Sequence, residues 1–263
     1  MCSKMESKPI AEHSETCLMR TPRIFQNQPL LEGNTVQLDE NGSRHLGKVL
    51  RMEEGAQVIL FNGTGGEYHG QITEIDKKWV KVSLDFFNEV DRTSPVHLHL
   101  GQVMGKGDHM DYALQKAVEL GVSEITPLLS QRCEVKLSSQ RMERKLEQWR
   151  HLLISACEQC GMNIVPTLNP PMTLLRWAET VEAERKWMLH TEDLPSNPFS
   201  GEAPQSLCFA VGPEGGFSPE EVEQSKDFGF DCITLGPRVW RTETAPAVLL
   251  SLVQLTWGDF LLD

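Results

Sequence analysis

Residues 208–250, CFAVGPEGGFSPEEVEQSKDFGFDCITLGPRVWRTETAPAVLL, decide the fold of this chain. An apolar run at 208–211 leads into a glycine turn and a helix, and a second apolar run at 232–235 leads into another glycine turn and another helix. The first helix is signalled by Ser218 as N-cap, Pro219 at the first helical position and Glu221 three residues after the cap. Two strand–turn–helix units in succession predict an α/β sheet with its glycine turns at the carboxyl ends of strands, where ligands bind.

The composition of the first turn restricts the ligand. Glycine lets the backbone approach a ligand closely and allows positive φ. A phosphate loop is excluded because Glu214 would repel phosphate, Pro213 has no N–H to donate, and no Gly-Lys-Ser/Thr follows. The two turns therefore favour a neutral or cationic ligand that is held by backbone groups.

Four blocks of sequence, taken together and in order, resemble one known family. They are RIFQNQPL with HLGKVLRMEEGAQVILFNGTGGEY (23–68), MDYALQKAVELGVSEITPL (110–128), ACEQCGMNIVP (156–166), and GPEGGFSPEE followed by LGPRVWRTETAPAVLLSL (212–252). They resemble the RsmE family, the 16S ribosomal RNA uridine N3-methyltransferases, which are S-adenosylmethionine enzymes of the SPOUT class. The resemblance covers nearly all of residues 20–260.

The domain organisation combines strand patterns with this resemblance. Short runs at 57–62, 69–75 and 79–84 predict a small barrel or sandwich, residues 86–95 are the candidate linker, and strands alternate with helices from Val96 onward. The resemblance implies a PUA-like β-barrel RNA-binding domain at 20–90 and a SPOUT α/β methyltransferase domain at 91–263 with a carboxyl-terminal trefoil knot. Residues 1–19 are polar and predict a disordered extension.

The composition indicates the cellular compartment and the state of the cysteines. The chain has no apolar stretch long enough to span a membrane, its first residues do not form a secretory signal, and seven cysteines without such a signal favour reduced thiols in the cytoplasm. Cys157-x-x-Cys160 is either a metal or redox motif or a pair of buried thiols in a helix; with no second pair to complete a zinc site, we expect no metal.

The charge distribution leaves two readings open. The formal net charge of −12 is awkward for RNA binding, because contacts to phosphate supply much of the affinity for nucleic acid. Basic residues nevertheless gather at 132–150 and again at 44–51. Because salt screens exposed charges beyond about 8–10 Å, local patches matter more than the total. These two clusters are either solvated faces or RNA contacts.

The resemblance implies a set of functional residues. Three loops would hold S-adenosylmethionine, with His190, Thr191, Gly212, Glu214, Gly215, Gly216, Leu235, Gly236, Val239, Trp240 and Thr242 as the cofactor-binding residues. Glu214 either favours the cationic sulfonium or holds its turn by hydrogen bonds, and Trp240 either stacks on a ring or fills the core. Arg241 and Arg238 are the candidates for stabilising charge on the uridine, and Glu243 either accepts the N3 proton or orients Arg241.

The expected partners follow from the same resemblance. Candidate RNA contacts are Arg23, Arg44, His45, Lys48, Arg51, Arg132, Glu158 and Gln159. The family's usual arginine after Glu-Gln-Ser/Cys-Gly is replaced here by Met162. We expect a homodimer that acts on 16S rRNA or the small ribosomal subunit, with helix 245–257 either in the core or in the dimer contact. Two alternatives are a SPOUT methyltransferase acting on tRNA or 23S rRNA, and a ribosome-assembly factor without catalytic activity.

Overall fold

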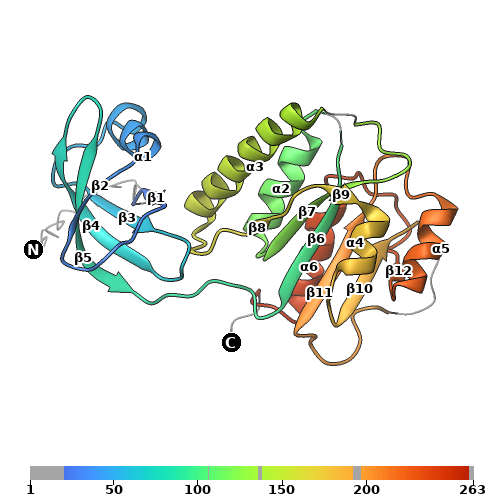
Figure 1. Ribbon diagram of the computed structural model, residues 1–263. Helices are drawn as coiled ribbons and strands as arrows, with labels where there is room; N and C mark the ends of the chain where they lie inside the picture. Colours follow the sequence, from blue (N-terminus) through green and yellow to red (C-terminus); the bar gives the residue numbers. More distant parts are fainter. Residues whose placement is uncertain (1–20, 106, 136–137, 192–196, 261–263) are drawn as a thin grey trace, which may run out of the picture.

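The computed structural model describes residues 21–105, 107–135, 138–191 and 197–260 and consists of two sheets with their helices, joined by one connecting segment (Figure 1). The predicted extension at 1–19 lies outside the described residues. Within the described residues, no helix is both long enough and apolar enough to cross a membrane.

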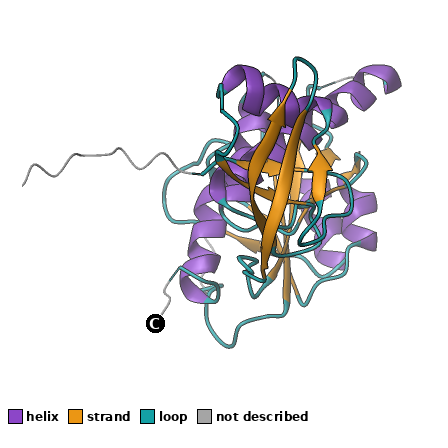
Figure 2. Cartoon of the chain, turned by 90° about the vertical axis from the view of Figure 1, so that its left-hand side faces the viewer, coloured by secondary structure: helices purple, strands orange, loops and turns teal. Residues whose placement is uncertain are grey.

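The amino-terminal part is a five-stranded sheet in the order β1-β3-β4-β5-β2. β1 pairs with β3 in parallel, and the other neighbours pair antiparallel. Its elements are β1 (Arg23–Phe25), β2 (Thr35–Gln37), α1 (Glu40–Arg44), the π-helix η1 (His45–Val49), β3 (Gln57–Phe61), β4 (Glu67–Ile75) and β5 (Val80–Asn88). Figure 2, viewed from this end of the molecule, shows these strands crossing in front of the larger part.

The two outer strands of the small sheet are tied together by side chains. Gln26, which follows β1, donates from Nε2 to Asp39 Oδ1 at 3.2 Å, and its Oε1 accepts from Asp39 N at 2.9 Å. Asp39 also caps the amino terminus of α1. The sheet encloses an apolar core made by Ile24, Leu30, Leu38, Leu46, Val58, Leu60, Ile72, Val80, Val82 and Leu84. This closure around one core agrees with the barrel that the strand pattern predicts.

The expected linker begins later than the sequence suggests. Phe86 and Phe87 do not leave the sheet but continue β5, in register with His69 and Tyr68 of β4. Their rings account for this, because Phe86 stacks on His69 with centroids 4.6 Å apart and Phe87 lies 4.8 Å from Tyr68. The extended connection therefore starts after Asn88.

The larger part is a seven-stranded sheet in which every pair of neighbouring strands is parallel. Its strands run in the order β12-β10-β11-β6-β7-β8, and β9 also pairs with β7. The elements are β6 (His97–Val103), α2 (His109–Glu119), β7 (Glu124–Leu129), α3 (Ser139–Cys160), β8 (Thr167–Leu168), β9 (Met172–Thr173), α4 (Leu174–Thr180), β10 (Arg185–Leu189), β11 (Ser206–Val211), α5 (Pro219–Asp227), β12 (Asp231–Ile233) and α6 (Ala245–Thr256). This is the α/β architecture predicted from the alternation of strands and helices.

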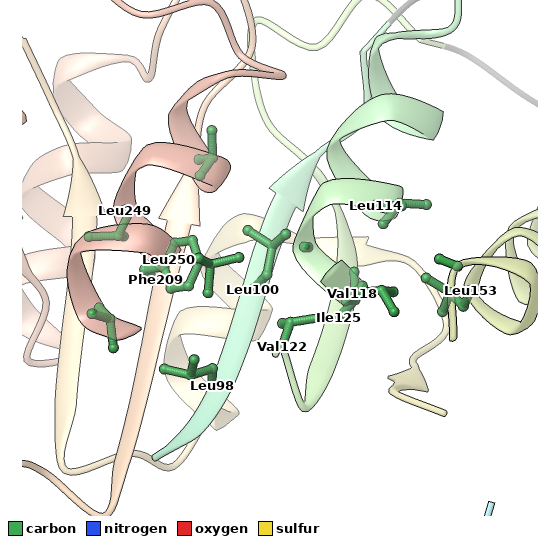
Figure 3. Packing of buried hydrophobic residues seen from close by; sticks show 14 of the residues in the cluster. Leu98, Leu100, Leu114, Val118, Val122, Ile125, Leu153, Phe209, Leu249 and Leu250 are labelled. Atoms are coloured by element: carbon green, nitrogen blue, oxygen red, sulfur yellow. The ribbon is translucent and has the colours of Figure 1, made fainter. Parts of the chain in front are cut away.

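Helices cover both faces of the large sheet. One cluster of buried side chains joins the strands to α2, α3 and α6, and a second joins them to α4 and α5. Figure 3 shows Leu249 and Leu250 of α6 beside Phe209 of β11, with Leu100 of β6 between them and Val118 of α2. All five residues are fully buried, at 0 % exposed. They anchor the sheet whose carboxyl-terminal edge carries the glycine turns.

A buried charge network joins the two parts. Arg23 of β1 pairs with Glu67 of β4, and Arg92 of the connecting segment donates from NH1 to Glu67 Oε2 at 3.0 Å. Both guanidinium groups also reach the carbonyl of Gly161 at the end of α3, at 3.1 and 3.0 Å. Asn163 completes the junction by accepting from Arg23 and donating to Val90 O. These bonds fix where the small sheet sits relative to the large one. The trefoil knot stays a prediction.

Candidate active site

Three loops meet at one edge of the large sheet because they follow three adjacent strands. β10 lies between β12 and β11, and parallel strands place their carboxyl ends at the same edge. The loops enclose a cavity of about 1010 Å³. Its lining includes every residue predicted to bind the cofactor or take part in catalysis, namely His190, Thr191, Gly212, Glu214, Gly215, Gly216, Leu235, Gly236, Arg238, Val239, Trp240, Arg241, Thr242 and Glu243.

The first glycine turn is shaped by close packing and one backbone bond. A Cβ on Gly212 would lie 3.2 Å from the ring of the buried Phe217, so a side chain there would have to displace that ring. Gly216 has φ +67°, a conformation that favours glycine, and its N–H donates to Pro213 O at 2.8 Å. The predicted capping box of Ser218 and Glu221 is present and starts α5 directly after the turn. The turn therefore presents backbone to the cavity.

The second loop is closed by its own tryptophan. Trp240 Nε1 donates to Leu235 O at 2.9 Å, and the guanidinium of Arg238 lies 5.6 Å from the centre of the Trp240 ring. Gly236, with φ +84°, makes the bend between Leu235 and Trp240. Trp240 packs against the main core and also lines the cavity; its stacking on a ligand ring stays a prediction.

Thr242 holds the second loop against the first turn. Its hydroxyl donates to Gly212 O at 2.7 Å and accepts from Gln102 Nε2, on β6, at 3.1 Å. Both side chains are buried. Thr242 lies between Arg241 and Glu243 in the sequence, and all three residues line the cavity. Gln102 was not among the residues singled out from the sequence; its place near the carboxyl end of a buried strand was the available signal.

Glu243 has a closer partner than the arginine expected for it. Its Oε1 lies 3.0 Å from His109 Nδ1 and 4.0 Å from Arg241 NH1. The Glu243 side chain is 15 % exposed, whereas that of Arg241 is 81 % exposed. His109 begins α2 just beyond β6 and lines the same cavity. Sequence reasoning missed it, although the rule that identified the glycine turns, a position after a parallel strand, applies to it equally.

Glu214 adds a second carboxylate to the cavity. It is exposed in the first turn, and its Oε1 lies 3.8 Å from where a Cβ on Gly105 would stand. The turn itself is held by the backbone bond to Pro213, and within the described residues no hydrogen bond of the Glu214 carboxylate is found. The described structure thus shows no hydrogen bond by which Glu214 would hold the turn, and its interaction with a sulfonium stays a prediction.

Comparison with known proteins places this site in a family. The RNA methyltransferase domain family matches residues 92–254, and the RNA methyltransferase PUA domain family matches residues 38–85. A ribosomal RNA small subunit methyltransferase E of Buchnera aphidicola subsp. Schizaphis graminum is 35% identical over 245 residues, which cover 91% of this chain and 98% of that protein. The chain belongs to the RsmE family.

Two further relatives agree with this placement. The RsmE protein of Bacillus subtilis is 29% identical over 88% of this chain and 96% of its own length. The crystal structure of the RsmE protein of Neisseria gonorrhoeae bound to S-adenosyl methionine superimposes with a TM-score of 0.86 at 35% identity, and covers 92% of this chain and 100% of that one. The chain thus has the PUA-like and α/β methyltransferase domains of this family.

The residues predicted to contact RNA fall into two groups relative to the RsmE cavity. Arg132 lies at its edge, where NH1 donates to Gly215 O at 2.7 Å. Arg44, His45, Lys48 and Arg51 are exposed on the small sheet, away from the cavity. Arg51 has φ 52°, an uncommon conformation for a residue with a side chain. RNA contact by these residues stays a prediction.

The structure gives Arg23 and Glu158 different surroundings from those expected. Arg23 is only 8 % exposed, and its guanidinium is taken up by the buried network at the junction, so its position does not support an RNA contact. Glu158 Oε1 accepts from Phe25 N at 3.0 Å, and burial raises the pKa of its carboxyl. Gln159 is exposed next to it. Charge in the sequence does not reveal such burial.

The methionine and the cysteine pair of this RsmE protein also lie at the junction. Met162 is buried and packs in the main core. An arginine in this position would have to direct its charged group out of the core. Cys157 is buried in α3, and burial raises the pKa of its thiol to about 12. These surroundings match the buried-thiol reading of Cys157-x-x-Cys160. Within the described residues no group of three or more potential metal ligands is found.

Proposed function

We propose that this protein transfers the methyl group of S-adenosylmethionine to N3 of a uridine near the 3′ end of 16S rRNA, which yields 3-methyluridine. The observation that carries the proposal is the convergence of both glycine turns, two arginines and a histidine–glutamate pair on one cavity. The cofactor in the related Neisseria gonorrhoeae structure supports the choice of methyl donor.

The cavity fits S-adenosylmethionine in size and in chemistry. Its volume of about 1010 Å³ is at the upper end of the range for small-molecule sites. Gly212 and Gly216 line the cavity without a side chain of their own, and Glu214 and Glu243 favour a positively charged ligand. We assign cofactor binding to the three loops, with Thr242 holding two of them together. When bound, S-adenosylmethionine supplies an electrophilic methyl group on a cationic sulfur.

Charge on the uridine is the first demand of the reaction. N3 carries a proton at neutral pH, so its removal places negative charge on the ring, which the neighbouring carbonyl oxygens share. Arg241 and Arg238 line the cavity, and arginine stays protonated, so both suit the stabilisation of that charge. Arg241 is well placed to reach a substrate because most of its side chain is exposed.

Removal of the N3 proton is the second demand. His109 and Glu243 are proton acceptors in the cavity, and the carboxylate lies within hydrogen-bond distance of Nδ1. A carboxylate in that position selects the tautomer with hydrogen on Nδ1, which leaves Nε2 to accept a proton. In the proposed reaction the N3–H proton passes to this pair, the N3 electron pair forms the bond to the methyl carbon, and the bond from that carbon to the sulfonium sulfur breaks with its electron pair left on sulfur.

The assembly state belongs to the same proposal. One face of α6 is in the core, whereas Val248 and Leu252 are half-buried and Leu255 is 50% exposed on the opposite face. An apolar stripe of this kind on a helix next to the cavity supports a homodimer that packs there. We propose that this dimer acts in the cytoplasm on 16S rRNA or the small ribosomal subunit.

Deletion of the gene tests the proposed product. We expect small-subunit rRNA from the deletion strain to lack one 3-methyluridine, and the purified protein with S-adenosylmethionine to restore it, as measured by mass spectrometry of nuclease fragments. Loss of a methyl group from tRNA or 23S rRNA instead would reassign the substrate. An unchanged pattern in every RNA, together with cofactor binding by calorimetry, would point to an assembly factor.

A further inference from the structure

Helix α3 connects the cavity to the small sheet. It has 22 residues and is therefore roughly 33 Å long at 1.5 Å per residue. Near its start, Lys145 Nζ lies 2.9 Å from Asp111 of α2, the helix whose first residue lines the cavity. Near its end, Glu158 accepts from Phe25 N of the small sheet. The two predicted RNA-contacting regions thus lie at opposite ends of one rigid helix (Figure 1).

One stripe along this helix is free of carboxylates. Residues spaced three and four apart share a face of a helix, and such a series runs the length of α3. It consists of Arg141, Arg144, Gln148, His151, Ser155 and Gln159, all of which are exposed. The acidic residues Glu143 and Glu147 are not members of this series, although Glu147, three residues from Arg144 and four from His151, lies at its border. The members of the stripe themselves are cationic or hydrogen-bonding groups.

The arginines of this stripe differ from several other cations of the protein, which are paired with carboxylates. Lys81, Lys116, Arg176 and Lys226 each lie within 4 Å of a carboxylate: Glu74, Glu119, Glu179 and Glu223 in turn. In the described part of the chain, no such ion pair involves Arg141 or Arg144. In a protein with a net charge of −12, cations on the connecting helix that form no ion pair in the described residues are a local feature that favours a polyanion.

We propose that this stripe is an RNA-binding track, on which the strand leading to the target nucleotide runs from the small sheet along α3 to the cavity. The track rests on the proposed action on RNA and adds the segment that joins its two ends. Arg141 and Arg144 contact phosphates, while Gln148 and His151 contact sugar or phosphate oxygens. Such contacts position RNA and do not select its sequence.

Matched substitutions on one helix test the track. Arg144→Gln removes a charge from the stripe, and Arg150→Gln removes the same charge from an exposed position on the other flank. Binding of the full-length protein to transcripts of the 3′ domain of 16S rRNA, of 23S rRNA fragments and of tRNA is measured by filter binding over a range of salt concentrations. Methyl transfer to the bound RNA is measured in parallel.

The expected result separates the two flanks. Arg144→Gln should weaken binding about fivefold and lower the slope of log K against log salt by about one, and the Arg141→Gln/Arg144→Gln double variant by about two. KM for RNA should rise while kcat at saturating RNA stays the same. Arg150→Gln should change neither quantity. Equal effects of Arg144→Gln and Arg150→Gln, or no effect of the double variant, would overturn the track.

The outcome is independent of which RNA is the substrate. If the wild-type protein binds and methylates tRNA or 23S rRNA in place of 16S rRNA, the proposed substrate fails, and the comparison of the two flanks is made on the RNA that binds. If the wild-type protein binds none of these transcripts at any salt concentration, both the track and the proposed function are wrong.

Discussion

Arginine and glutamate meet in two regions of this protein, and the two meetings differ in how fully their charges are satisfied. At the junction of the sheets, Glu67 is contacted by Arg23 and Arg92, and both arginines also bind the carbonyl of Gly161. At the cavity, the nearest carboxylate oxygen to Arg241 NH1 is 4.0 Å away, and the side chain is largely exposed. The same residue types therefore have several protein partners in one place and few in the other.

Burial explains the difference. A charge removed from water is costly unless partners replace its hydration, and at the junction both terminal nitrogens of Arg23 have such partners, whereas its buried Nε has none. The Arg241 side chain is exposed to water, so its charge does not need a permanent protein partner before a substrate binds. An arginine that stabilises the fold and an arginine that serves catalysis are therefore distinguished by their burial and partners, and mutations at the two sites should have opposite consequences.

The largest effect is expected from Arg23→Ala at the junction. The substitution leaves the buried Asn163 and Glu67 with fewer partners, and removal of one member of a buried ion pair costs about 3–5 kcal/mol. The free energy of unfolding, measured by urea denaturation, should fall by about that amount. Lys81→Ala, which breaks an exposed pair with Glu74, is the control and should cost under about 1 kcal/mol.

Acid dependence identifies the junction as the source of that loss. Burial alone would raise the pKa of Glu67, but hydrogen bonds and charges from Arg92 and Arg23 lower it from 4.5 to about 2. Because the folded pKa is the lower one, the contribution of Glu67 to stability is present above pH 4.5 and is lost as the pH falls towards 2. Arg23→Ala should show a weaker dependence in this window; an unchanged dependence contradicts the assignment.

Next in size is the loss of activity expected from Arg241→Ala. Removal of one preorganised group that stabilises developing charge commonly lowers kcat by about 10²–10³-fold. Because Arg241 is exposed and its one ion-pair contact, to Glu243, is as long as 4.0 Å, the free energy of unfolding and the cofactor dissociation constant should stay close to those of the wild type. Single-turnover methyl transfer and calorimetry measure the two quantities.

Arg176→Ala is the matched control for this prediction. Arg176 is also exposed, but it pairs with Glu179 on α4, outside the cavity. Its substitution should leave kcat and the cofactor dissociation constant within about twofold of the wild-type values. The free energy of unfolding should stay close to that of the wild type. An Arg241→Ala protein that methylates at the wild-type rate would remove Arg241 from the proposed mechanism, whereas one that no longer folds would place it with the structural arginines.

The cavity was predictable from the sequence because its determinants are local. Gly212 and Gly236 stand directly after apolar runs, and a parallel sheet brings the ends of its strands to one edge. The order β12-β10-β11 then places the three loops side by side. The place of the two glycine turns needed no knowledge of long-range contacts, whereas the third loop, at His190 and Thr191, was implied by the family resemblance.

The junction was not predictable, because it depends on contacts between distant segments. Arg23 meets Glu67 across 44 residues and Gly161 across 138 residues, and nothing near Arg23 in the sequence distinguishes it from an exposed arginine. His109 was missed for a related reason, since its partner Glu243 lies on the last loop of the chain. Phe86 and Phe87 likewise resembled a linker until their partners on β4 were known.

Thr242→Val should have a smaller effect than Arg23→Ala or Arg241→Ala. It tests the comparison of the two regions, because Thr242 is buried like Arg23 and lies at the cavity like Arg241. Valine keeps the shape of the side chain but leaves Gln102 Nε2 and Gly212 O without the hydroxyl. An unmade buried hydrogen bond costs about 1–3 kcal/mol. We expect unfolding stability to fall within that range and cofactor binding to weaken about tenfold.

Rescue by Thr242→Ser shows whether the hydroxyl is responsible. Serine restores the group that donates to Gly212 O, so cofactor affinity should return to within about threefold of the wild type, although the lost methyl group still lowers stability. Gln102→Met should weaken cofactor binding through the same contact, and its combination with Thr242→Val should weaken binding no more than the stronger single change. Additive losses in the double variant would mean that Gln102 and Thr242 act separately, and the cavity would then be held by backbone turns alone.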